Sequence, residues 1–251
     1  MARRFIVAGN WKMNTNIEEG ILLAEQIQHG QRNPETEVIL AVPYTHLFPI
    51  KKKIKASSGI RLAAQNCHDR NAGAFTGEIS PTVLNTMKIP YVIIGHSERR
   101  MYNNESNELL ASKIQAALNN GLKVIFCCGE SLDIRRSNEH VNFVKQQLEE
   151  SLFTVDSTTM KHIVIAYEPV WAIGTGETAS PQQAQEMHAA IRKMIHNKYG
   201  KRIADNISIL YGGSVKGSNA KDIFCQEDVD GGLVGGASLD SSDFLKIINS
   251  L

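Results

Sequence analysis

Eight short runs rich in β-branched residues recur along the chain, and a helix-like pattern follows each of them. The runs are FIVAGN (5–10), EVILAV (37–42), IRLAAQ (60–65), YVIIG (91–95), LKVIFCC (122–128), HIVIAYE (162–168), NISILYG (206–212) and DGGLVGG (230–236). Most of them are apolar on both faces, which is typical of strands buried in a parallel sheet. Eight strand–helix alternations in 251 residues predict an α/β fold, a single closed (β/α)8 barrel.

The clearest helical pattern lies between the sixth and seventh runs. Ser180 is the predicted N-cap, Pro181 suits the first helical position, and Gln183 completes a capping box. Gly200 is predicted to end this helix. A second helix is predicted over 105–120, and the helices after the third, seventh and eighth runs are expected to be short. In the helix that begins after Ser180, one apolar face is shared by Ala184, Met187, Ile191, Met194 and Ile195.

No linker, block of charge or low-complexity segment divides the sequence, so we expect residues 1–251 to form one domain. A doubly wound open sheet is the structural alternative. It ranks second because such a sheet normally has fewer strands.

A barrel of this kind carries its catalytic and binding residues at the carboxyl ends of the strands. Polar residues and glycines do gather there: Asn10, Lys12, Gln65, Asn66, His96, Glu98, Glu130, Glu168, Ser214, Gly235 and Gly236.

Composition narrows the range of partners. A formal net charge of +1 argues against a general electrostatic partnership with nucleic acid or with a membrane surface. No stretch approaches about 18 uninterrupted apolar residues, so we expect no membrane span. The four cysteines show no CxxC spacing, which predicts free thiols and no zinc site.

Targeting signals are also not expected. The apolar run in MARRFIVAGNWK (1–12) is too short for a signal peptide. The last three residues, 249–251, match a peroxisomal Ser-Lys-Leu signal only loosely. We therefore expect a cytoplasmic protein.

Two motifs at strand ends suit a polar, anionic ligand. In GNWK (9–12), Asn10 and Lys12 occupy alternate positions, so in an extended segment they point the same way. Taken alone, an exposed lysine after a strand is the simpler interpretation. In GHSERR (95–100), His96 ends an apolar strand, and Ser97 is expected to begin a helical turn. His96 can donate a hydrogen bond to a substrate oxygen, and a histidine satisfied by backbone groups is the alternative.

Glycine pairs end the last two runs, in LYGGSVKG (210–217) and LVGGASL (233–239). Each precedes a short helix, and exposed backbone N–H groups there predict a phosphate site, which barrels place after strands seven and eight. Ordinary turn chemistry is the alternative. GTGETA (174–179) fits a dinucleotide-binding pattern, but it does not follow its strand directly and lacks the acidic residue about 20 residues on, so we reject that site.

Taken together, five motifs resemble the triosephosphate isomerase family. They are GNWKMN (9–14), GHSERR (95–100), YEPVWAIGTG (167–176), YGGSVKG (211–217) and LVGGASL (233–239), in order along essentially the whole chain. The resemblance implies a TIM barrel that interconverts dihydroxyacetone phosphate and glyceraldehyde 3-phosphate through an enediolate, with no metal or redox cofactor. The one departure is peripheral: Gly232 stands where a bulkier residue is frequent in the family.

The resemblance also implies roles for four catalytic residues. Glu168 takes the carbon-bound proton, and His96 polarises the carbonyl as a neutral imidazole. Lys12 and Asn10 stabilise negative charge on the substrate and the enediolate. A helix that begins at Ser97 gives a physical reason for neutral His96, because a helix N-terminus disfavours imidazolium.

By the same resemblance, backbone N–H groups bind the phosphate at Gly174, Ser214, Gly235 and Gly236. A lid over 169–176 closes on the site; its residues include Pro169, Val170, Trp171, Ala172, Ile173, Thr175 and Gly176. Tyr211 and Ser214 latch the lid through Ala179 and Gly176, while Ile173 and Leu233 pack over Glu168. Glu98 supports Lys12, and Cys127 is a packing residue.

The long loop 65–80 resembles the interdigitating loop of a homodimer, with Phe75 exposed and Thr76 reaching the partner's Asn10–Lys12 region. Two other functions remain open. One is a different phosphate-binding barrel, which would not need a single base followed by a Pro–Val–Trp lid. The other is a catalytically silent barrel that binds phosphosugars or acts as a surface interaction protein.

Overall fold

Eight parallel strands close on themselves to form the barrel in the computed structural model, which describes residues 3–173 and 178–251. The strands are β1 (Phe5–Asn10), β2 (Thr36–Ala41), β3 (Ile60–Ala64), β4 (Tyr91–Ile94), β5 (Lys123–Cys128), β6 (Ile163–Tyr167), β7 (Ile209–Tyr211) and β8 (Gly231–Val234). They pair in chain order, and β1 closes the ring on β8 with Ile6 opposite Gly231. The predicted barrel is therefore confirmed, and the open-sheet alternative is excluded.

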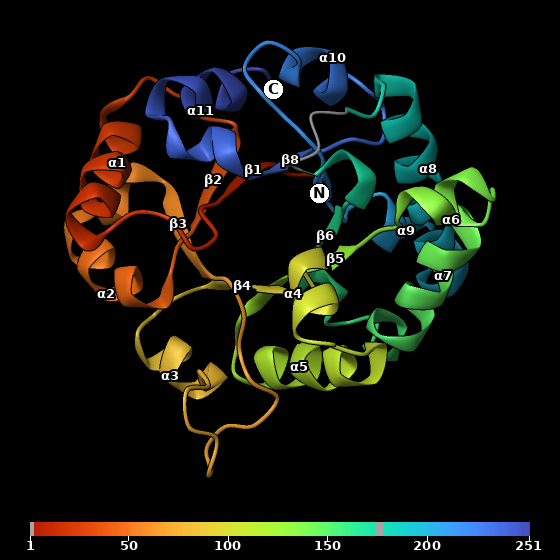
Figure 1. Cartoon of the computed structure of the whole chain (residues 1–251), viewed down its shortest axis with the longest axis horizontal. Helices are drawn as coiled ribbons and strands as arrows, with labels where there is room; N and C mark the ends of the chain where they lie inside the picture. Colours follow the sequence, from red (N-terminus) through yellow and green to blue (C-terminus); the bar gives the residue numbers. More distant parts are fainter. Residues whose placement is uncertain (1–2, 174–177) are drawn as a thin grey trace.

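Helices surround the strands on the outside of the barrel (Figure 1). They are α1 (Ile17–His29), α2 (Tyr44–Lys53), α3 (Pro81–Thr86), α4 (Ser97–Tyr102), α5 (Asn107–Asn119), α6 (Leu132–Arg136), α7 (His140–Glu150), α8 (Pro181–Tyr199), α9 (Lys201–Ala204), α10 (Ala220–Phe224) and α11 (Ser241–Ile248). The described residues also form five short 3₁₀ segments: η1 (Ala56–Ser58), η2 (Leu152–Thr154), η3 (Met160–His162), η4 (Val170–Ala172) and η5 (Gly236–Leu239).

Side chains alternate between two hydrophobic layers because successive strand residues point to opposite faces. One layer fills the barrel: Ile6, Ala8, Ile39, Ala41, Ala63, Tyr91, Ile93, Ile125, Cys127, Val164, Ala166, Leu210 and Leu233. The other layer packs the outer strand faces against the helices. Cys127 lies in the inner layer, where burial raises the pKa of its thiol well above the usual value, so it remains a neutral packing group.

The predicted capping of α8 is present. The Ser180 hydroxyl accepts a hydrogen bond from the N–H of Gln183 at 3.1 Å, and the Gln183 side chain accepts one from the N–H of Ser180 at 2.8 Å. Gly200 ends the helix with a φ of 87°, a conformation that favours glycine. The predicted helix at 105–120 begins at Asn107 instead, because Ser106 is its N-cap and Glu105 is buried in ion pairs.

Candidate active site

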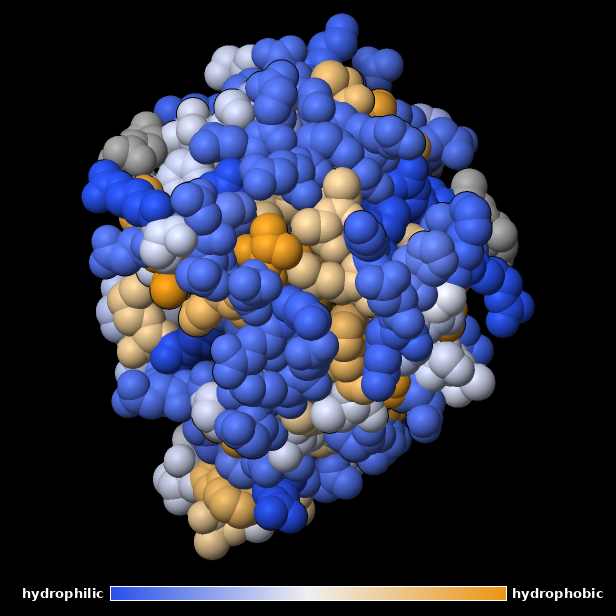
Figure 2. All heavy atoms as spheres, turned by 90° about the vertical axis from the view of Figure 1, so that its right-hand side faces the viewer, coloured by the Kyte–Doolittle hydropathy of each residue, from blue (hydrophilic) through white to orange (hydrophobic). Residues whose placement is uncertain are grey.

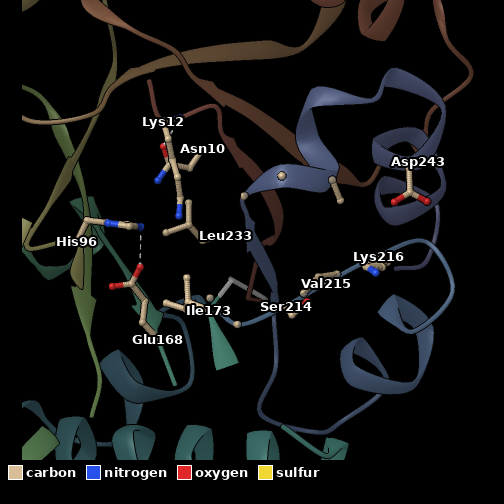
Figure 3. A pocket seen from close by; sticks show the side chains of 15 residues that line it. Asn10, Lys12, His96, Glu168, Ile173, Ser214, Val215, Lys216, Leu233 and Asp243 are labelled. Carbon is tan, nitrogen blue, oxygen red and sulfur yellow. Dashed lines mark hydrogen bonds and ion pairs between the residues drawn. The ribbon is translucent and has the colours of Figure 1, made fainter. Parts of the chain in front are cut away.

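A cavity of about 390 Å³ opens at the carboxyl end of the barrel (Figure 3). The ends of β1, β4, β6, β7 and β8 supply its walls, which is where the barrel fold predicts chemistry. Its lining residues are Asn10, Lys12, His96, Glu168, Ile173, Gly212, Gly213, Ser214, Val215, Lys216, Leu233, Gly235, Gly236, Ala237 and Asp243. The structure therefore brings the four predicted catalytic residues together with three of the predicted phosphate-binding residues.

Glu168 is the most enclosed charged group in this cavity, with 2% of its surface exposed. Its Oε1 lies 3.0 Å from Nε2 of His96, and its Oε2 accepts a hydrogen bond from the N–H of Ser97 at 2.8 Å. Gly129 permits this placement, since a Cβ there would lie 1.7 Å from the carbonyl oxygen of Glu168. Two short hydrogen bonds hold the carboxylate on the β4 side of the site.

His96 serves as the N-cap of α4, as the sequence predicted for a helix starting at Ser97. Its Nδ1 accepts a hydrogen bond from the N–H of Glu98 at 3.3 Å, so Nε2 carries the proton that is donated to Glu168. Burial lowers the pKa of His96, but the charge and hydrogen bond of Glu168, together with the charge of Glu98, outweigh it and raise the pKa overall. The Glu168 carboxylate therefore favours the protonated imidazole in this arrangement, whereas the N-terminus of α4 is expected to disfavour it.

Lys12 has a strained backbone, with a φ of 52°. The Asn10 side chain accepts a hydrogen bond from the Lys12 N–H at 3.1 Å, and Gln65 Nε2 donates to the Lys12 carbonyl at 2.9 Å. The ammonium lies 2.5 Å from Oε1 of Glu98, the predicted support residue. Figure 3 shows Asn10 and Lys12 extending into the cavity on the side of His96.

The opposite wall of the cavity is built from glycine-rich backbone. Ser214 follows β7, while Gly235 and Gly236 follow β8. A Cβ at Gly236 would meet no atom of the described residues within 4 Å, so crowding by these residues does not explain this glycine. Gly174, the remaining predicted phosphate-binding residue, lies outside the described residues.

The start of the predicted lid is anchored by Glu130, which is fully buried. Its carboxylate accepts hydrogen bonds from the Tyr167 hydroxyl at 2.9 Å and from Trp171 Nε1 at 3.0 Å. Its carbonyl accepts the N–H of Val170 at 3.0 Å. Pro169 precedes η4, which contains Val170, Trp171 and a buried Ala172. Burial raises the pKa of Glu130, and the two side-chain donors oppose that rise.

Two apolar side chains, Ile173 and Leu233, line the cavity beside Glu168, where the resemblance placed them (Figure 3). Thr175 and Gly176 lie outside the described residues. The Tyr211 hydroxyl is buried, with no hydrogen-bond partner of normal geometry among the described residues. Burial raises the pKa of Tyr211 to about 12, although the nearby backbone of Ala179 acts in the opposite direction.

Phe75 and Thr76 do not line the cavity and are exposed; they belong to loop 65–80, which projects from the barrel at the lower edge of Figure 1. The Phe75 side chain is 44% exposed, and its ring centroid lies 4.3 Å from that of His68. The projecting segment also appears at the lower edge of Figure 2, where it carries apolar atoms. The structure therefore separates these two residues from the catalytic group within one chain.

Sequence reasoning missed the roles of several residues around the site. Gln65 and Glu130 stood at predicted strand ends, which was the available signal, but no function was attached to them. Lys216 and Asp243 line the far side of the cavity (Figure 3), and Asp243 Oδ1 accepts the N–H of Gly217 at 3.2 Å. Nothing in the sequence places Asp243, on α11, beside the loop that follows β7.

The described residues contain neither a cluster of metal ligands nor a membrane-spanning helix. No group of three or more His, Cys, Asp or Glu among them is placed to hold a metal ion. No helix in the described part of the chain is both long and apolar enough to cross a membrane.

Comparison with known proteins agrees with the barrel fold. The family model described as triosephosphate isomerase matches residues 5–251. A triosephosphate isomerase of Cytophaga hutchinsonii is 49% identical over 251 residues, covering 99% of both chains. Triosephosphate isomerases of Porphyromonas gingivalis and Bacteroides fragilis are each 50% identical over 250 residues, again covering 99% of both chains. The chain belongs to the triosephosphate isomerase family.

Proposed function

We propose that the protein interconverts dihydroxyacetone phosphate and D-glyceraldehyde 3-phosphate by moving a proton between adjacent carbons through an enediolate. The observation that carries the proposal is the meeting of Glu168, His96 and Lys12 in one cavity that faces a glycine-rich wall. A base, a proton donor and a cation are the groups that this reaction needs, and a glycine-rich wall suits the phosphate. The proposal requires no metal or redox cofactor.

Glu168 is the proposed base. Its carboxylate is buried beside Ile173 and Leu233, which exclude water from it and strengthen it. Both oxygens are hydrogen-bonded on the β4 side, to His96 and to the N–H of Ser97. To reach a carbon-bound proton the side chain gives up the Ser97 contact and turns into the cavity.

His96 and Lys12 act on the oxygens of the substrate. The Nε2–H of His96 points into the cavity, and it donates to the carbonyl oxygen once Glu168 has turned toward the carbon. The Lys12 ammonium and the Asn10 amide stabilise the charge that develops on the enediolate oxygens. Glu98 and Gln65 act as positioning residues, because they hold the ammonium and the carbonyl of Lys12.

The phosphate binds against the backbone of Ser214, Gly235 and Gly236, with Gly174 joining them by resemblance to the family. Glycine leaves the N–H groups open to an anion that a Cβ would crowd. The segment 169–176 is the proposed lid, anchored at its start by Glu130. Tyr211 offers its buried hydroxyl as a latch for the chain near Ala179, and Ser214 latches the part near Gly176.

We further propose a single-domain, cytoplasmic protein that forms a homodimer through loop 65–80. The dimer is supported by large apolar side chains that are exposed to solvent in a single chain, near the carboxyl ends of the strands. Met13 is 96% exposed and Tyr102 is 75% exposed. In this arrangement Phe75 packs on the partner, and Thr76 reaches toward Asn10 and Lys12 of the second copy.

A coupled assay of triose phosphate conversion tests the function directly. Purified protein in buffer with a chelator and no added cofactor is expected to convert dihydroxyacetone phosphate. The catalytically silent alternative predicts binding of triose phosphate with no conversion, and that result would overturn the proposal. Light scattering on the same sample tests the dimer.

A further inference from the structure

A second hollow, of about 680 Å³, lies at the amino end of the barrel. It is surrounded by residues at the starts of β1, β2, β3 and β5, including Phe5, Thr36, Arg61 and Lys123. Because all strands are parallel, these starts share the end of the barrel that faces away from Glu168. Its volume falls within the range typical of small-molecule sites.

Positive charge predominates around this hollow. The lining cations are Arg4, Arg32, Arg61 and Lys123, and the lining carboxylates are Glu35 and Glu37. Arg4 pairs with Glu37 at 2.6 Å, and the Tyr91 hydroxyl donates to the same carboxylate at 2.8 Å. Glu37 is therefore already paired with a cation. Among the described residues, Arg32, Arg61 and Lys123 have no ion-pair partner.

Two of these cations are held in place by neutral groups. Arg32 donates through Nη2 to the carbonyl of Ser58 at 2.9 Å, while its buried Nε has no acceptor among the described residues. The Lys123 ammonium lies 5.1 Å above the centroid of the Tyr91 ring and 3.4 Å from its hydroxyl. Such contacts orient a cation without cancelling its charge.

The local field acts against these charges. Burial lowers the pKa of Lys123, Arg4 and Arg61 lower it further, and Glu37 opposes them. On the same side, Lys161, Lys123 and Arg4 all lower the pKa of His162, after burial. A group of like charges of this kind is relieved when an anion binds among them.

We propose that this hollow at the amino end of the barrel binds a multiply charged phosphate anion, separately from the triose phosphate cavity. Guanidinium groups match phosphate oxygens in pairs, and an ammonium adds a point charge. Arg61 and Lys123 are the main contacts, with Arg32 beside them. Glu35, which has no ion-pair partner in the described part of the chain, weakens the site. The inference does not depend on the catalytic roles given above.

Equilibrium dialysis with labelled pyrophosphate tests the proposal. The triose phosphate cavity lies at the opposite end of the barrel, so pyrophosphate that variants of the hollow fail to bind is assigned to the hollow. The wild type is expected to bind pyrophosphate saturably, with a component that is weakened in these variants. The double variant Arg61→Ala/Lys123→Ala is expected to bind about 30-fold more weakly, since two contacts with the anion are lost.

Matched variants separate a built site from general surface charge. Arg136→Ala/Lys221→Ala removes two exposed cations that do not line the hollow and should bind like the wild type. Arg61→Lys/Lys123→Arg keeps the charge and should keep the site, and Glu35→Gln should tighten it. If the cations of the hollow bind only solvent, pyrophosphate shows no saturable binding, or both double alanine variants lose the same amount of affinity. Either result overturns the proposal. Isomerase activity is measured separately, so failure of one proposal leaves the other intact.

Discussion

Glu168 and His96 are hydrogen-bonded to each other, with 3.0 Å between Oε1 and Nε2, in the enclosed part of the cavity. The contact couples the charges of the two groups, because burial lowers the pKa of His96 while Glu168 raises it. The state of the proposed proton donor thus depends on where the proposed base points. When Glu168 turns toward a substrate carbon, burial and the N-terminus of α4 favour neutral imidazole.

This coupling predicts that Glu168→Gln lowers the pKa of His96. With the carboxylate charge gone, burial is the largest remaining influence. NMR titration of the His96 ring in both proteins measures the shift. Glu98→Gln serves as a comparison and should lower the pKa by a smaller amount, because Glu98 is a weaker contributor than Glu168. An unchanged titration in Glu168→Gln would show that the two groups are not coupled.

Gln65→Ala is expected to reduce kcat/KM about fivefold, which corresponds to the loss of a hydrogen bond worth about 1 kcal/mol. Gln65 donates to the carbonyls of Lys12 and Ala41, and it ties down the strained Lys12 backbone. Steady-state kinetics measure the effect, and the exposed Gln31→Ala is the control. If both variants match the wild type, Gln65 does not position Lys12.

Gly236→Ala is expected to raise KM about tenfold, equivalent to about 1.4 kcal/mol, with little change in Tm. The added Cβ meets no atom of the described residues within 4 Å, so the expected effect falls on the bound ligand and not on the packing of these residues. Gly231→Ala is the contrasting variant, because its Cβ would lie 2.0 Å from the Ile6 carbonyl at a φ of 120°. That change should lower Tm. An unaltered KM in Gly236→Ala would remove Gly236 from the phosphate site.

His188 is predicted to make the protein sensitive to acid. It is fully buried, and burial lowers its pKa to about 3, whereas an unfolded histidine titrates near pH 6.5. The unfolded chain therefore binds more protons between these values, and stability falls as the pH falls through that window. Between pH 6.5 and 5 the contribution is about 2 kcal/mol.

Denaturant unfolding at several pH values checks this prediction. His188→Phe should show a shallower loss of unfolding free energy between pH 6.5 and 5 than the wild type. His29→Gln, at an exposed position, should follow the wild type. Parallel curves for His188→Phe and the wild type would assign the acid sensitivity to other groups.

The barrel could be predicted from the sequence because its strands are local signals. Runs such as YVIIG are apolar on both faces, and Ser180, Pro181 and Gly200 mark the ends of α8. The ends of helices could not be predicted where tertiary contacts override the local sequence pattern. Glu105 fits the helical pattern, yet it lies outside α5, and its carboxylate forms ion pairs with Lys113 at 2.6 Å and with Arg99 at 2.7 Å.

The site was predictable where each residue stands in its own motif, as His96 and Glu168 do. Relationships between distant residues were not. Glu130 carries no local sign that it will bind Trp171, which is 41 residues away. The hollow at the amino end of the barrel combines residues from Arg4 to Lys123, and only closure of the barrel brings them together. Coupling of His96 to Glu168 likewise depends on side-chain geometry.

The most direct test of the central claim is the isomerisation of dihydroxyacetone phosphate in D₂O, followed by proton NMR. If Glu168 takes the proton from C1 and exchanges it with solvent before it protonates C2, the wild type forms glyceraldehyde 3-phosphate that carries solvent deuterium at C2. Glu168→Gln should then be slower by about 10²–10⁴-fold, the usual contribution of a general base. Product without deuterium, or a Glu168→Gln variant as fast as the wild type, would contradict the account.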